Sequence, residues 1–171
     1  MNVKFSTKFV AASAAAVMAL SLAGCSGGSM DDSSSSSAKA SGDSITIGTV
    51  TTNSGTAAAY GEAEVKGFEL AGSEINAKGG INGKKVKLES MDDKGDATEA
   101  SNAYNKLAGD NNVLAVAGPT ISATTAAVAP LADQSKLVTI APAATSDSIE
   151  TGNYLFRTCF KDSYHCLLYT S

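Results

Sequence analysis

Two points in the sequence place hydroxyl side chains directly after an apolar run. Ser122, with two threonines close behind it, follows the run 113–117, and Thr145 with Ser146 follows the run 137–140. Hydroxyls and free backbone amides at the start of a helix or turn suit a small anion such as a carboxylate. Local evidence by itself favours purely structural roles, with Ser122 as a helix N-cap and Thr145 as a turn residue.

Signals for catalysis, metals or cofactors are weak. The chain has a single histidine, His165, and no G-x-S-x-G, so a Ser/His/Asp hydrolase has little support. Four acids between positions 92 and 99 superficially resemble a calcium loop, but their spacing is wrong, and we predict a solvated loop and a helix cap instead. We therefore predict no metal, no cofactor and no enzyme activity. An exported dinucleotide-dependent enzyme is the alternative, although the loop after the first predicted strand lacks G-x-G-x-x-G.

The elements that would position the hydroxyls alternate between strands and helices. Apolar periodicity predicts strands near 45–50, 86–88, 113–117, 137–140 and 154–157, with helices over 65–75, 96–109 and 122–134. Asp96 and Glu99 form a predicted capping box, and Pro130 should kink or shorten its helix. This order predicts an α/β fold with an open, mostly parallel sheet flanked by helices. Ligands of such sheets bind beyond the carboxyl ends of the strands, where Ser122 and Thr145 stand.

The N-terminus has the features of an export signal. Two lysines in the first eight residues precede an uncharged apolar stretch that is too short to span a bilayer. The stretch ends in Leu22-Ala23-Gly24-Cys25, which resembles the lipobox of bacterial lipoproteins, in which the cysteine is acylated. An ordinary secretory signal is the alternative. We predict a signal peptide over 1–24, lipidation at Cys25 and a Ser/Gly-rich tether over 25–44.

Composition and charge limit the partners. The 171 residues are 43% apolar and 18% charged, which excludes a disordered acidic tail and a polytopic membrane protein. Without the predicted signal peptide, 11 basic residues face 17 acidic ones, a net charge of −6. This balance argues against binding to nucleic acid, which needs a basic face.

A longer series of motifs extends from residue 45 to about 164. It comprises Tyr60-Gly61, the run from Glu74 to Gly83, Asp92-Asp93, Ser122 with Thr125, Ala141-Pro142-Ala143-Ala144-Thr145 and Phe156-Arg157-Thr158. In this order and spacing the chain resembles the leucine/isoleucine/valine-type substrate-binding proteins of ABC transporters, which are type I periplasmic binding proteins. The resemblance implies a two-lobed receptor that closes about a hinge, with residues 45–164 as part of its first lobe.

The same resemblance implies a set of ligand contacts. Ser122 and Thr145 would bind the α-carboxylate of an amino acid such as leucine, isoleucine or valine. The carbonyl of Ala143 would accept from the ammonium group, and Tyr60 would line the side-chain pocket. The implied partners are a membrane permease and, through the lipid anchor, the extracytoplasmic face of the cell membrane. A ligand sensor of the same fold is the alternative.

The last residues depart from the family pattern. The sequence after Tyr164 does not continue as the family does, so we expect a truncated chain whose residues 165–171 are not native. A disulfide between Cys159 and Cys166 is a further possibility that depends on Cys166 being genuine.

Overall fold

The computed structural model describes residues 44–149 and 152–170. The predicted signal peptide, Cys25 and the tether as far as residue 43 lie outside the described residues. The elements in chain order are β1 (Ser44–Thr51), α2 (Ala58–Ala77), β2 (Lys85–Asp92), α3 (Ala97–Gly109), β3 (Val113–Ala117), α4 (Ser122–Ser135), β4 (Val138–Ala141), β5 (Leu155–Arg157) and α5 (Asp162–Thr170).

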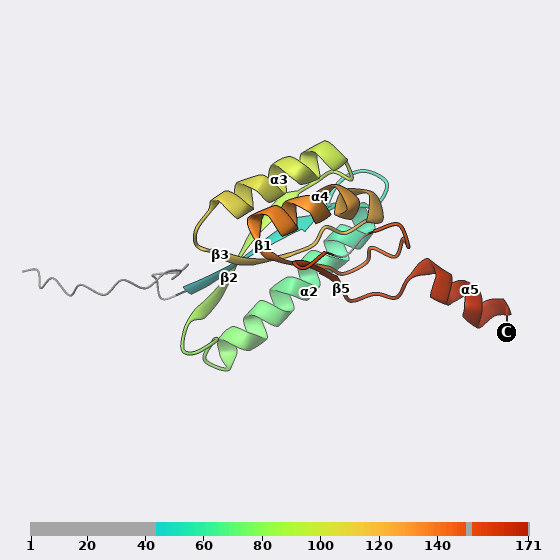
Figure 1. The fold of residues 1–171 in the computed structure, drawn as a ribbon. Helices are drawn as coiled ribbons and strands as arrows, with labels where there is room; N and C mark the ends of the chain where they lie inside the picture. Colours follow the sequence, from blue (N-terminus) through green and yellow to red (C-terminus); the bar gives the residue numbers. More distant parts are fainter. Residues whose placement is uncertain (1–43, 150–151, 171) are drawn as a thin grey trace, which may run out of the picture. The chain divides into compact units, whose positions relative to one another are not determined.

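The five strands form one parallel sheet in the order β2-β1-β3-β4-β5. Helices α3 and α4 cover one face of this sheet, and α2 lies on the other (Figure 1). The predicted open α/β sheet flanked by helices is therefore confirmed. Parallel strands bring the loops after β1, β3 and β4 to one edge, the edge at which ligands of such sheets bind.

The main core lies between the sheet and the pair α3 and α4. Tyr104 and Leu107 on α3, Val128 on α4 and Leu155 on β5 are fully buried there. The hydroxyl of Tyr104 forms hydrogen bonds with Ser135 Oγ at 3.0 Å and Thr139 Oγ1 at 3.2 Å. These partners satisfy a polar atom that burial would otherwise penalise.

The opposite face of the sheet is covered unevenly. Helix α2 packs against β2 and β1. Beyond it, Val138, Ile140 and Phe156 on β4 and β5 keep 39%, 40% and 50% of their surface exposed. This face is therefore open over the last two strands of the sheet.

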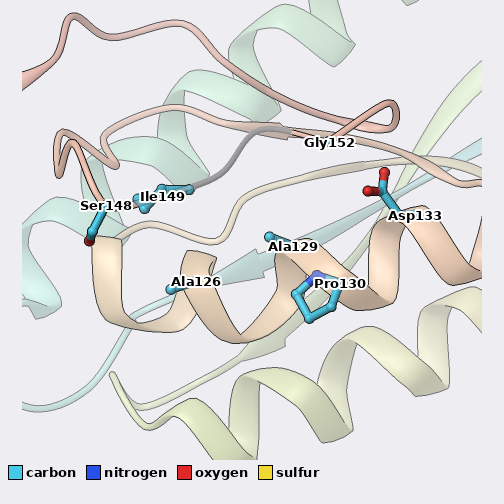
Figure 2. A pocket seen from close by; sticks show the side chains of 7 residues that line it. All are labelled: Ala126, Ala129, Pro130, Asp133, Ser148, Ile149 and Gly152. Atoms are coloured by element: carbon cyan, nitrogen blue, oxygen red, sulfur yellow. The ribbon is translucent and has the colours of Figure 1, made fainter.

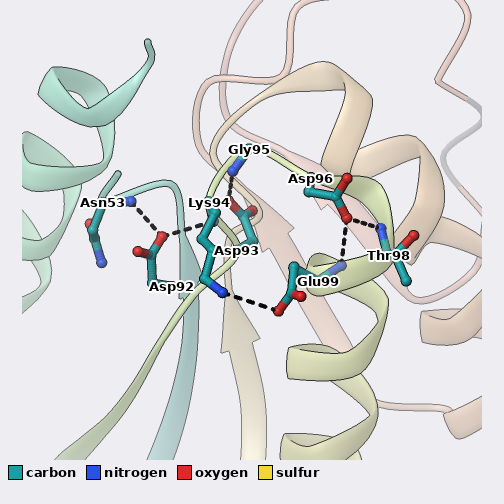
Figure 3. Close-up of polar contacts among 8 residues, drawn as sticks. All are labelled: Asn53, Asp92, Asp93, Lys94, Gly95, Asp96, Thr98 and Glu99. Carbon is teal, nitrogen blue, oxygen red and sulfur yellow. Dashed lines mark hydrogen bonds and ion pairs between the residues drawn. The ribbon is translucent and has the colours of Figure 1, made fainter. Parts of the chain in front are cut away.

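The turn between β2 and α3 corrects two expectations (Figure 3). Asp96 caps α3 as predicted, accepting from the backbone N–H groups of Thr98 at 2.8 Å and Glu99 at 2.9 Å. A capping box also predicts that the Glu99 carboxylate accepts from the backbone N–H of Asp96. That part of the prediction is wrong, because the Glu99 carboxylate pairs with Lys94 Nζ at 3.7 Å. Asp93 is fully buried, so the predicted solvated loop is wrong at that position.

The second half of the chain settles one expectation and one possibility that the sequence left open. Helix α4 continues through Pro130 to Ser135, so the proline does not shorten it. Cys159 and Cys166 are both free, so the disulfide is not formed. Helix α5 is exposed along its length and includes most of the predicted non-native segment, whose origin stays a prediction.

Candidate functional site

Three loops at the carboxyl edge of the sheet line an open hollow of about 330 Å³. Its lining comes from the start of α2, the β3–α4 loop and the segment after β4, and consists of Ala57, Tyr60, Thr120, Ile121, Ser122, Ala143 and Thr145. All four ligand-contact residues expected from the sequence, Tyr60, Ser122, Ala143 and Thr145, therefore lie around one hollow.

Ser122 is the first residue of α4 but does not cap it. The N-cap position belongs to Ile121, which makes no side-chain capping bond. Ser122 Oγ instead accepts a hydrogen bond from the backbone N–H of Ser146 at 3.2 Å. Because a hydroxyl that accepts one bond still has its proton to donate, Ser122 can bind an anion in the hollow.

Tyr60 stands between the polar hollow and an apolar neighbour. Its side chain, 66% exposed, lines the first hollow and also a second one of about 400 Å³. The second hollow is walled by Ala59, Tyr60, Ala63, Glu64, Pro142 and Ala143. The two hollows together offer hydroxyls on one side of Tyr60 and apolar surface on the other.

The position of Tyr60 depends on the glycine that follows it. A Cβ atom on Gly61 would lie 2.0 Å from the carbonyl oxygen of Thr52, at the end of β1. Only a residue without a side chain lets α2 approach the backbone of that strand so closely. Gly61 thereby fixes the first turn of α2 at the rim of the hollow.

Sequence analysis missed a polar network behind the hollow. Thr120 Oγ1 donates to Glu64 Oε2 at 2.6 Å and accepts from the backbone N–H of Thr52 at 3.1 Å. Thr52 Oγ1 in turn donates to Asp93 Oδ1 at 2.6 Å. The available signal was that Glu64 lies four residues after Tyr60, on the same face of α2. The network joins the loops after β1, β2 and β3.

The pKa values of Glu64 and Asp92, two acids at this edge of the sheet, are shifted in opposite directions. Burial, and then the charge of Asp93, raise the pKa of Glu64 against the lowering effect of the hydrogen bond from Thr120. Among the described residues, neither Glu64 Oε1 nor Asp93 Oδ2 has a hydrogen-bond partner. The pKa of Asp92 is lowered: some burial opposes the shift, but hydrogen bonds from the backbone N–H groups of Lys94 and Asn53 outweigh it.

A hollow of about 490 Å³ lies elsewhere, along α4 (Figure 2). Its lining consists of Ala126, Ala129, Pro130, Asp133, Ser148, Ile149 and Gly152. The Asp133 carboxylate is engaged by the backbone N–H of Tyr154 at 3.0 Å. None of the expected ligand contacts lines this hollow, so its size does not make it the candidate site.

The described part of the chain offers neither a metal cluster nor a membrane span. Within residues 44–149 and 152–170, no group of three or more His, Cys, Asp or Glu side chains could hold a metal ion. No helix in the same ranges has the length and apolar character needed to cross a membrane.

An open parallel sheet with small polar groups gathered beyond its carboxyl ends defines a class of α/β ligand-binding folds. A family model described as "Periplasmic binding protein" matches residues 44–166. The chain therefore belongs to the periplasmic binding protein family.

Individual relatives agree with this membership. The chain is 36% identical over 120 residues to the Leu/Ile/Val-binding protein BraC3 of Rhizobium johnstonii, covering 69% of this chain and 32% of the relative. The structure of this chain resembles that of the branched-chain amino acid transporter substrate-binding protein LivJ from Streptococcus pneumoniae, which was solved in complex with isoleucine. For LivJ the TM-score is 0.67 and the identity 42%, covering 70% of this chain and 35% of LivJ.

A further solved relative is an ABC transporter substrate-binding protein from Desulfitobacterium hafniense in complex with Leu. There the TM-score is 0.66 and the identity 28%, covering 74% of this chain and 38% of the relative. The chain thus spans about a third of the length of the curated relatives it matches.

Proposed function

We propose that the chain supplies part of the first lobe of a substrate-binding component of an ABC importer for branched-chain or related amino acids. The observation that carries the proposal is the gathering of Tyr60, Ser122, Ala143 and Thr145 around one hollow. Relatives named for Leu, Ile and Val binding, and solved with isoleucine or Leu, support the ligand class. The partner that would receive the ligand is a membrane permease.

The proposed binding mode follows from the chemistry of a zwitterion. Both charges of an amino acid must find partners when it leaves water. The hydroxyls of Ser122 and Thr145 would donate to the carboxylate, and the carbonyl of Ala143 would accept from the ammonium group. Tyr60 and the apolar hollow beside it would contact the side chain. Closure of a second lobe would then exclude the remaining water.

Export and anchoring belong to the same proposal. Residues 1–24 would be removed as a signal peptide, and Cys25 would carry the lipid that holds the protein at the extracytoplasmic face of the cell membrane. Two or more acyl chains give a lasting anchor where one gives only reversible binding. The Ser-rich residues up to 43 would act as a tether, since the folded domain begins with Ser44 in β1.

The binding site is tested by removing its hydroxyls one at a time. Ser122→Ala and Thr145→Ala should each weaken isoleucine binding by about 1.5 to 3 kcal/mol, the usual contribution of a hydrogen bond to a charged group. The measurement is a titration of the isotope-labelled chain, followed by amide NMR shifts, which detects weak binding. Ser101→Ala is the matched control, because its hydroxyl bonds only to the Ala97 carbonyl within α3.

Two results would contradict the proposal. One is a chain that shows no response to isoleucine at any concentration. The other is equal affinity in Ser122→Ala, Thr145→Ala and Ser101→Ala, which would leave the two hydroxyls with structural roles only.

A further inference from the structure

Arg157 is the only arginine in the sequence, and its guanidinium is committed to a single loop. It ends β5 and is half-buried. Nη1 donates to the carbonyl oxygens of Ala144 at 3.2 Å and Ser146 at 2.9 Å. Nη2 donates to the carbonyl oxygen of Ile149 at 2.8 Å. Three hydrogen bonds from one side chain therefore hold the loop that follows β4.

The placement of these bonds matters more than their number. Ala144 and Ser146 are the neighbours of Thr145 on either side, so the guanidinium fixes the chain both before and after it. The backbone N–H of Ser146 donates to Ser122 Oγ at 3.2 Å. Arg157 thus acts on both hydroxyl residues of the hollow, Thr145 through its flanking carbonyls and Ser122 through Ser146.

Arginine suits this position for a geometric reason. A planar guanidinium presents five N–H donors in fixed directions, whereas an ammonium group is a compact point charge on a flexible stem. Of the 13 basic residues, 12 are lysines and one is arginine. The single arginine stands where one side chain holds several carbonyl oxygens at once.

Among residues 44–149 and 152–170, Arg157 forms no ion pair with a carboxylate. Its guanidinium instead donates to the three carbonyl oxygens of Ala144, Ser146 and Ile149. Asp147 is near enough for Arg157 and Lys161 to contribute to lowering its pKa, behind the hydrogen bonds from Ser163. The guanidinium is bonded to the carbonyl oxygens on either side of Thr145, and a positive charge beside this residue favours an anionic group nearby.

We propose that Arg157 is a positioning residue of the ligand site, which holds the loop around Thr145 in its binding geometry and makes the site selective for a carboxylate over its neutral amide. The selectivity rests on the proposed function, whereas the loop geometry does not. The two parts are therefore tested by separate measurements on the same variants.

The first measurement needs no ligand. Amide hydrogen exchange at Ser146 should become at least about ten-fold faster in Arg157→Ala than in wild type, and by less in Arg157→Lys. Lys161→Ala is the matched control, since it removes a positive charge near the same loop without touching the three carbonyls. Unchanged exchange at Leu107 and Val116 in the core would show that each variant is folded. Equal exchange at Ser146 in wild type and Arg157→Ala overturns the positioning role.

The second measurement compares two probes, L-isoleucine and L-isoleucinamide. Arg157→Ala should weaken isoleucine binding at least about ten-fold and isoleucinamide binding by no more than about three-fold, because only isoleucine carries the carboxylate. Lys161→Ala should change neither by more than about two-fold. Equal losses for the two probes overturn the selectivity and leave Arg157 a structural residue.

Two complications are separated by the design. If wild type binds neither probe, the proposed function fails, and exchange at Ser146 alone supports or overturns the positioning role. If Arg157→Ala does not fold, Arg157→Lys decides the positioning role: it keeps the charge but not the planar guanidinium, so faster exchange at Ser146 supports that role and wild-type exchange overturns it.

Discussion

Glu64 carries a carboxyl group that the fold partly removes from water beside a second acid, Asp93. Its pKa is raised above the ordinary 4.5, mainly by burial. Between the unfolded and folded pKa values the native state therefore binds more protons than the unfolded chain. The contribution of Glu64 to stability is fully present below that window and is lost as the pH rises through it. Asp92, whose pKa is lowered, has the opposite sign and loses its contribution as the pH falls.

This sign predicts the behaviour of Glu64→Gln. A glutamine oxygen still accepts from Thr120, but no charge is buried at neutral pH. The melting temperature of the variant relative to wild type should therefore be higher at about pH 7 than at about pH 4. Thermal unfolding followed by circular dichroism measures the melting temperatures of variant and wild type at the two pH values. Glu62→Gln, at an exposed position on the same helix, serves as control. The same difference in melting temperature between variant and wild type at both pH values would contradict the raised pKa of Glu64.

At the residue scale, the sequence indicates candidate groups where their signal is local, and their role in binding stays a prediction. Ser122 and Thr145 were found as hydroxyls that follow strands, whereas Tyr60 and Ala143 came only from the family resemblance. The bond between Ser146 and Ser122 spans 24 positions, and the clamp of Arg157 depends on how β5 lies beside β4. Contacts of this kind are made by tertiary packing and leave no local pattern in the sequence.

At the scale of elements, two of the three glycines in helix α2 have opposite requirements. Gly61 faces the end of β1, where a Cβ atom would meet the Thr52 carbonyl oxygen at 2.0 Å. Gly67 has nothing within 4 Å of its Cβ position. Gly61→Ala should destabilise the fold by about 1 to 3 kcal/mol through overpacking. Gly67→Ala should stabilise it by about 0.5 to 1 kcal/mol, because alanine is the better helix former.

Urea denaturation of both variants measures this contrast. The two substitutions add the same methyl group to the same helix, so helix propensity cancels and packing alone separates them. Gly61→Ala should also move the amide signals of Tyr60, whereas Gly67→Ala should not. Equal stability of the two variants would show that α2 does not need its close approach to β1.

The order of elements was predictable because each carries its own signal. Val86 and Leu88 alternate with charged residues in β2, and Asp96 caps α3. Pro130 does not shorten α4, because the cost of a proline depends on its surroundings: Ala126 and Pro130 are both exposed, so the carbonyl that loses its helical donor can turn to water. Lys94 adopts a left-handed backbone with φ of 54°, and its pairing with Glu99 could not be read from spacing.

At the scale of the whole described domain, the two faces of the sheet are unequal. One face packs against α3 and α4, and the other leaves Val138, Ile140 and Phe156 partly exposed beyond α2. The core that stabilises the fold therefore lies mainly on one side. The exposed apolar side chains favour self-association at high concentration, so binding is best measured on dilute protein.

The groups around the hollow also limit how tightly the 171-residue chain can bind. Micromolar affinity requires about −8 kcal/mol. Two or three charge-assisted hydrogen bonds contribute about 3 to 9 kcal/mol in total, against an association cost of at least about 4 kcal/mol. Tyr60 is 66% exposed, so water competes for the same bonds and holds them near the lower value.

We therefore expect the chain to bind isoleucine more weakly than micromolar, in the millimolar range. An NMR titration at low protein concentration measures this, with Ser122→Ala as the control that shows the signal comes from the hollow. Micromolar affinity in a monomeric chain would contradict the prediction. Such affinity would mean that the groups described around this hollow are sufficient to enclose the ligand without an opposing lobe.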